Sequence, residues 1–137
     1  MESVYLITSQ ERSNEHFGTG FVIEKDEAAT WLLTCAHVVE AIGEGAPLMA
    51  GSHPAEVVTR IKGEDLALLR VDAPLPSDPL PLLVSAKAGD PVRMVGHSNQ
   101  AGQYLERTVL GRLDKRAHVK TPGMDRRVRA WELVVES

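Results

Sequence analysis

The hydrophobic positions of this chain fall into short runs separated by glycine, proline and charged residues. Runs of this length, rich in Val, Leu and Ile, favour β-strands. We expect strands at Val4–Thr8, Gly20–Ile23, Trp31–Thr34, Ala55–Arg60, Leu66–Val71, Val92–Val95, Val109–Leu113 and Ala130–Val135. Only Ala36–Ile42 has helical character, and Gly43 ends it. The pattern predicts an all-β fold, either a barrel or a sandwich of antiparallel strands.

A proline-rich segment, Asp72–Pro81, interrupts this pattern and contains four of the eight prolines. Proline cannot donate a hydrogen bond to a sheet, so the segment is expected to be an extended connector. It predicts a first unit over residues 1–82 and a second over residues 83–137. The second unit offers three predicted strands, which are too few for a closed barrel.

The composition is typical of a globular domain, with 137 residues, of which 43% are hydrophobic and 25% charged. No apolar run approaches the roughly 18 to 20 residues that cross a bilayer. The first residues lack the basic and apolar regions of a secretory signal. Cys35 is the only cysteine, which excludes an intrachain disulfide and a cage of several thiolates. We therefore expect a cytoplasmic protein with no membrane partner.

The charge is distributed unevenly. The segment from Arg107 to Arg129 contains eight basic and two acidic residues, a net charge of +6. Because the whole chain has a net charge of −4, the other residues together have a net charge of −10. A basic stretch can bind nucleic acid, but no aromatic residues interleave with these charges as base stacking would require. We interpret the stretch as the solvated face of a hairpin, with nucleic-acid binding as a weaker hypothesis.

Two polar residues, His37 and Asp65, stand at the ends of apolar runs. His37 follows the buried run that ends at Thr34, where packing holds a side chain in place and one edge stays open, as a general base requires. Asp65 precedes the apolar run Leu66–Val71. A carboxylate beside a buried strand is unfavourable unless it is paired, and an imidazole N–H is a suitable partner. We predict that these side chains form a hydrogen bond; the alternative to catalysis is a pair that only stabilises a loop.

Three segments resemble trypsin-like serine proteases of the chymotrypsin fold (S1 type), with the closer likeness to bacterial trypsin-like and HtrA-type domains. These are Gly18–Phe21 (Gly-Thr-Gly-Phe), Leu33–Val39 (Leu-Thr-Cys-Ala-His-Val-Val) and Asp65–Leu69 (Asp-Leu-Ala-Leu-Leu). The likeness continues more weakly through Val92–His97 and Gly111. The resemblance implies a complete six-stranded first barrel and a partial second one. It also implies that His37 is the general base and Asp65 its orienting partner in acyl transfer, with no cofactor.

The family's nucleophile lies in a Gly-Asp-Ser-Gly-Gly type motif after a strand that resembles Trp131–Val135, and the sequence ends at Ser137 before such a motif. We therefore expect a truncated or split endopeptidase that acts on protein or peptide substrates but is inactive as this chain alone. Its open second unit predicts self-association or pairing with a complementary C-terminal fragment. The alternative hypothesis is an inactive protease fold that serves as a protein-interaction module.

Other candidate residues carry weaker signals. We expect Cys35 to be a small core residue, Ser98 a loop residue, and Ser137 not to be catalytic. Trp31 and Trp131 are expected to fill the core. Four further histidines show no ligand spacing, so no metal site is expected; they are His16, His53, His97 and His118.

Overall fold

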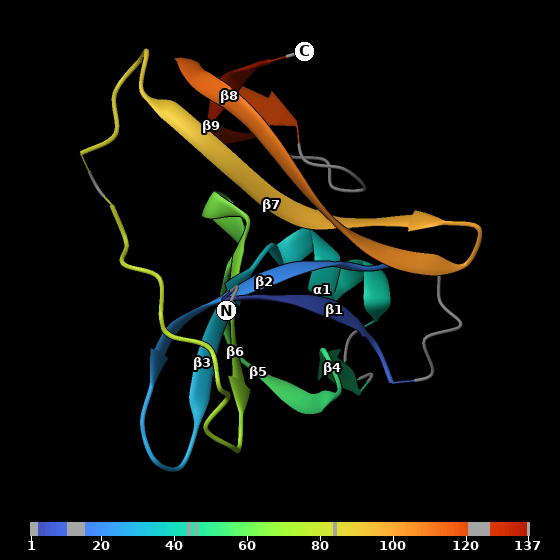
Figure 1. The fold of residues 1–137 in the computed structure, drawn as a ribbon. Coiled ribbons are helices and arrows are strands. Elements are labelled where there is room, and N and C mark those ends of the chain that lie inside the picture. Colours follow the sequence, from blue (N-terminus) through green and yellow to red (C-terminus); the bar gives the residue numbers. More distant parts are fainter. Residues whose placement is uncertain are drawn as a thin grey trace. The chain divides into compact units, whose positions relative to one another are not determined.

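Six strands close into an antiparallel barrel in the order β1-β2-β3-β6-β5-β4 (Figure 1). The computed structural model describes residues 3–10, 16–43, 45, 47–83, 85–120 and 127–136. The barrel strands are β1 (Val4–Ser9), β2 (Gly18–Lys25), β3 (Thr30–Thr34), β4 (Leu48–Ala50), β5 (His53–Ile61) and β6 (Leu66–Val71). The predicted all-β fold with a closed first barrel is confirmed.

Strand β4 is the one barrel strand that the hydrophobic pattern did not predict. It has three residues, too few to show a periodicity, and it pairs with β1 on one side and β5 on the other. Its position between these two strands closes the barrel. A closed barrel leaves no unpaired strand edge.

The barrel core forms from the inward positions of the strands and from one face of α1 (Ala36–Ile42). Ile7, Val22, Leu32 and Leu69 are completely buried. Burial of such a side chain contributes about 1.5–3 kcal/mol. The helix adds the buried side chains of Val38, Val39 and Ile42. Within the described part of the chain, no helix is long and apolar enough to span a membrane.

The proline-rich segment has no strand, yet it is tied to the first barrel by hydrogen bonds. The Thr30 hydroxyl donates to the carbonyl of Ala73 over 2.8 Å and accepts from the N–H of Leu75 over 2.9 Å. The hydroxyls of Tyr5 and Ser77 lie 2.8 Å apart, and the Leu75 side chain is 1% exposed. By its internal contacts the chain divides into two compact units, Met1–Pro81 and Leu82–Ser137. The connector thus packs as part of the first unit.

The second unit contains a three-stranded antiparallel sheet in the order β7-β8-β9. Its strands are β7 (Pro91–Gln100), β8 (Gln103–Lys120) and β9 (Arg127–Val135). They are longer than the predicted runs, and β7 and β8 meet at Ala101 and Gly102, which have φ values of 53° and 84°. Ser98, expected in a loop, lies in β7. Backbone pairing extends these strands through polar residues, which a hydrophobic pattern does not reveal.

The predicted core positions of the two tryptophans are wrong. Both side chains are only half-buried, and an arginine guanidinium lies over each ring. Arg70 is 5.7 Å from the centre of the Trp31 ring, and Arg116 is 5.1 Å from that of Trp131. Each arginine is the direct cross-strand partner of its tryptophan. Trp31 alternates with the buried residues Thr30 and Leu32, so its ring points away from the barrel interior.

Candidate active site

Strand pairing brings His37 and Asp65 to the same end of the first barrel. Strands β3 and β6 are antiparallel neighbours, with Thr34 opposite Ala67. The end of β3 therefore lies beside the beginning of β6. His37 follows β3 as the second residue of α1, and Asp65 stands between the short 3-10 helix η1 (Lys62–Glu64) and β6.

Three hydrogen bonds join Asp65 to the segment that carries the histidine. The ring nitrogen Nδ1 of His37 lies 2.6 Å from Oδ2 of Asp65. The backbone N–H of His37 donates to Oδ1 of the same carboxylate over 2.8 Å. The backbone N–H of Ala36 donates to the carbonyl of Asp65 over 3.2 Å. The carboxylate is thus fixed in both position and orientation.

This geometry selects one form of the imidazole. A carboxylate can only accept hydrogen bonds, so Nδ1 of His37 carries the proton and Nε2 presents its lone pair. The His37 side chain is 23% exposed and that of Asp65 is 8% exposed. The arrangement can take up a proton at Nε2 while the buried carboxylate stabilises the resulting imidazolium. The predicted contact between the two side chains is confirmed; the catalytic role stays a prediction.

The two glycines of the Gly-Thr-Gly segment each allow a close approach, Gly18 to the helix α1 and Gly20 to strand β1. A Cβ atom added at Gly18 would lie 2.6 Å from a methyl carbon of Val38, and one at Gly20 would lie 3.0 Å from Cδ1 of Ile7. The residue between them accepts a hydrogen bond at its carbonyl from the Thr34 hydroxyl over 2.9 Å. The segment therefore positions both the end of β3 and the helix that carries His37.

Cys35, which we expected to be a small core residue, lies at the edge of the core beside this pair. Its side chain packs against the core but is only half-buried. The sulfur of Cys35 lies close to the proposed catalytic pair. This sulfur, a ring nitrogen of His37 and a carboxylate oxygen of Asp65 all lie within 4.8 Å of one another. Burial raises the pKa of the thiol, and the negative charge of Asp65 raises it further. The pattern of hydrophobic and polar residues could not predict that Cys35 lies near His37 and Asp65. The direction of a side chain between a strand and a helix depends on the local backbone conformation.

The other candidate residues have separate surroundings. Ser98 accepts a hydrogen bond from Nε of Arg107 over 3.3 Å. His97 lies opposite Glu106 in the sheet; burial lowers its pKa, and Glu106 partly opposes this effect. Ser137 lies outside the described residues. The basic residues of β8 and β9 are exposed where described.

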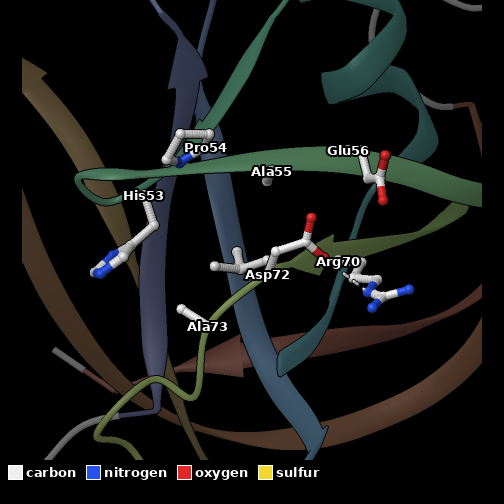
Figure 2. A pocket seen from close by; sticks show the side chains of 8 residues that line it. His53, Pro54, Ala55, Glu56, Arg70, Asp72 and Ala73 are labelled. Carbon is white, nitrogen blue, oxygen red and sulfur yellow. Dashed lines mark ion pairs between the residues drawn. The ribbon is translucent and has the colours of Figure 1, made fainter. Parts of the chain in front are cut away.

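A surface pocket of about 400 Å³ opens at the other end of β6 (Figure 2). Its lining includes the ion pair of Arg70 and Asp72, with 3.0 Å between Nε and Oδ1. Both side chains are well exposed, so the pair adds little stability. The strand Leu66–Val71 separates this pocket from Asp65, which corresponds to roughly 16–20 Å along a strand. The pocket is therefore not part of the His37–Asp65 site.

The closed antiparallel barrel, the partial second sheet and the histidine–aspartate pair together define a protein of the trypsin-like peptidase class. The model of the family "Trypsin-like peptidase domain" matches residues 18–133. The chain belongs to this family. No match was found among curated proteins.

Solved structures with the same fold include a protease from M. tuberculosis and Deg5. The active form of the Rv3671c protease from M. tuberculosis is 28% identical with a TM-score of 0.64, and the alignment covers 94% of this chain and 56% of that one. The inactive form of this protease gives 23% identity and a TM-score of 0.67, over 98% of this chain and 65% of that one. Deg5 is 19% identical with a TM-score of 0.66, and the alignment covers 98% of this chain and 69% of Deg5. The last two likenesses concern the fold alone. This chain spans little more than half the length of the first of these structures.

Proposed function

We propose that this chain is part of a trypsin-like serine endopeptidase that cleaves protein or peptide substrates by acyl transfer. His37 acts as the general base, and Asp65 orients its ring. The observation that supports this role is the 2.6 Å contact between Nδ1 of His37 and Oδ2 of Asp65, with the second carboxylate oxygen bound by the His37 backbone N–H. The double attachment holds the ring in the orientation that proton transfer at Nε2 needs.

In the proposed reaction, Nε2 of His37 accepts the proton of a serine hydroxyl as the serine oxygen attacks the carbonyl carbon of the scissile peptide. The imidazolium then gives this proton to the departing amine, which leaves an acyl-enzyme. Water then loses a proton to Nε2 and attacks the acyl carbon. The imidazolium returns this proton to the serine oxygen as the acid leaves. Asp65 stays ionised throughout and stabilises the imidazolium.

The proposal places the nucleophilic serine outside these 137 residues. The sequence contains no Gly-x-Ser-Gly motif. Three of the described serines have other partners: Ser3 donates to the carbonyl of Asp78, Ser77 contacts the Tyr5 hydroxyl, and Ser98 accepts from Arg107. A further segment, from the same polypeptide or from another, would supply the serine and the backbone donors of the oxyanion hole. The 137-residue chain alone is then expected to be inactive.

Labelling with a fluorophosphonate probe tests this function, because the probe reacts with activated serines. The 137-residue chain should not be labelled, whereas a longer product of its reading frame that carries a Gly-x-Ser-Gly segment should be. Asp65→Asn in the longer protein should lower kcat by roughly 10⁴-fold, since it favours the wrong tautomer of His37. His118→Ala is the matched control, because His118 is exposed on β8.

Two results would contradict the proposal. Labelling of the 137-residue chain would mean that it contains a nucleophile of its own. A longer, folded protein with the serine motif that resists the probe and cleaves no peptide would show that the His37–Asp65 pair has no catalytic role.

A further inference from the structure

The thiol of Cys35 lies beside the proposed catalytic pair and has no part in the proposed reaction. Its sulfur, a His37 ring nitrogen and an Asp65 carboxylate oxygen lie within 4.8 Å of one another. Among the described residues, this group brings three types of metal donor close together: a thiol, an imidazole and a carboxylate. Small movements of side chains would bring all three to one bound ion.

The backbone explains why the thiol faces this point. Cys35 is the N-cap residue of α1, with an extended conformation (φ −87°, ψ 142°), and its side chain makes no capping hydrogen bond. The thiol is therefore not occupied by the helix terminus. The donor atoms of the two groups lie within 4.8 Å of each other, so a thiolate at Cys35 would repel the Asp65 carboxylate. A cation held between the two groups would turn this repulsion into attraction.

The chemistry of the three donors selects a class of metal. Thiolate, imidazole and carboxylate are the ligands that Zn²⁺ takes in proteins, whereas Mg²⁺ and Ca²⁺ require oxygen ligands. Soft thiolate ligands also favour Cd²⁺ over hard cations. Three protein ligands leave a fourth tetrahedral position for water. His37 is 23% exposed, so an ion can reach the group from solvent.

We propose that Cys35, His37 and Asp65 form a binding site for Zn²⁺ that inhibits the protease. On binding, the Cys35 thiol loses its proton to solvent, and sulfur, one imidazole nitrogen and one carboxylate oxygen donate electron pairs to the ion. If Nδ1 is the ligand, its proton moves to Nε2 and the hydrogen bond to Asp65 is lost. If Nε2 is the ligand, it can no longer accept the serine proton. Either way, the metal and the general base exclude each other.

The inhibitory consequence rests on the proposed function, but metal binding does not, so binding is tested first on the 137-residue chain. Titration with Cd²⁺ should produce an ultraviolet thiolate-to-cadmium charge-transfer band that saturates at one ion per chain. Since Cys35 is the only cysteine, the band reports on this thiol. Zn²⁺ should remove the band by displacing Cd²⁺, and Mg²⁺ should not.

Variants separate the three-ligand site from a simple thiol adduct. Cys35→Ser should abolish the band. Asp65→Asn and His37→Ala should each weaken binding at least about tenfold, the lower limit for changes even in the surroundings of a metal site. His118→Ala should bind as the unchanged chain does. Circular dichroism confirms that each variant is folded, and Asp65→Asn, the smallest of these changes, decides the result if His37→Ala does not fold.

Two outcomes would overturn the site. A band that is insensitive to Asp65→Asn and His37→Ala would mean that the thiol alone binds the ion. Saturation at half an ion per chain would mean that cysteines of two chains share it.

Inhibition is then measured in the longer protein by the rate of fluorophosphonate labelling. Zn²⁺ should slow labelling, and a chelator should restore it. For each protein the labelling rate is expressed relative to its metal-free rate. On this scale, Cys35→Ser should need at least about ten times more Zn²⁺ for the same inhibition as the unchanged protein. Cadmium binding without any labelling would contradict the proposed function and leave the site intact. Labelling that Zn²⁺ does not affect, in a protein that binds Cd²⁺, would overturn the inhibitory role alone.

Discussion

At the scale of single residues, Asp65 combines an unusual backbone conformation with three hydrogen bonds. Its φ of 55° lies in the left-handed region, which Asp and Asn adopt more readily than other residues with a side chain. The bonds to Ala36 and His37 hold it there. Asn can keep this backbone while it removes the charge and replaces one accepting oxygen by a donating NH2 group, so Asp65→Asn changes the charge and the hydrogen bond to His37 without a change of backbone conformation.

The reactivity of Cys35 tests the electrostatics of the same site. Alkylation by iodoacetamide requires the thiolate, and the raised pKa of Cys35 means that less thiolate is present at a given pH. We expect the inflection of the rate–pH profile to lie above that of an exposed thiol. Asp65→Asn should move this inflection to lower pH, because one of the two causes is removed, while burial keeps it above the ordinary value.

The matched control for this measurement is Asp72→Asn. Asp72 lies beyond the other end of β6, and its side chain is 76% exposed. This variant should leave the profile unchanged. An inflection that moves equally in both variants, or in neither, would contradict a direct effect of Asp65 on the thiol.

At the scale of secondary-structure elements, the contact between Gly18 on β2 and Val38 on α1 determines where the helix lies. A Cβ at position 18 would stand 2.6 and 2.8 Å from the two methyl carbons of Val38, which is branched and buried. We expect Gly18→Ala to displace α1 and to lower the free energy of unfolding by about 1–3 kcal/mol, as overpacking does. Thermal unfolding measures the loss, and the downfield proton NMR signal of the His37 Nδ1–H should broaden or shift.

Gly63→Ala provides the control for this prediction. A Cβ at Gly63 meets nothing within 4 Å and needs no positive φ, so this change should stay within about 0.5 kcal/mol. Equal stability of the two variants would mean that the helix can move away from β2 without loss.

At the scale of the whole molecule, the second unit exposes apolar side chains and two strand edges. Within the described residues, β7 and β9 each pair with β8 alone. Val92, Gly111 and Val135 lie across from one another, and Val135 is 55% exposed. Exposed strand edges and apolar patches promote association with another chain.

We therefore expect the 137-residue chain to self-associate or to bind a complementary segment. Sedimentation equilibrium should show a mass that increases with protein concentration. A peptide that supplies the following strands should raise the thermal midpoint, because it binds only the folded form. Val135→Lys should reduce association, whereas Val58→Lys, at a residue 50% exposed on β5, should not. A monomer at every concentration, with a midpoint that the peptide does not change, would contradict the open second unit.

Much of the fold follows from local patterns. Apolar runs report burial, so five of the six barrel strands and the three strands of the second sheet could be predicted from them. Strand β4 could not, because three residues show no period, and β7 and β8 continue through polar residues because backbone bonds hold them. The hydrophobicity of the two tryptophans predicts burial in the core, but it does not indicate which face of the strand each residue occupies. That face depends on register.

The same division applies to the site. The sequence predicted that His37 and Asp65 would meet, because a polar residue at the end of each buried strand needs a partner and the surrounding segments resemble one family. The position of Cys35 was decided only by the tertiary structure. Antiparallel pairing of β3 with β6 brings Asp65 beside the turn from strand to helix. Cys35 has an extended backbone in this turn, and its sulfur lies near the Asp65 carboxylate. Hydrophobic patterning reports how deeply a residue is buried, whereas the direction of a side chain at a junction depends on dihedral angles that neighbouring strands impose.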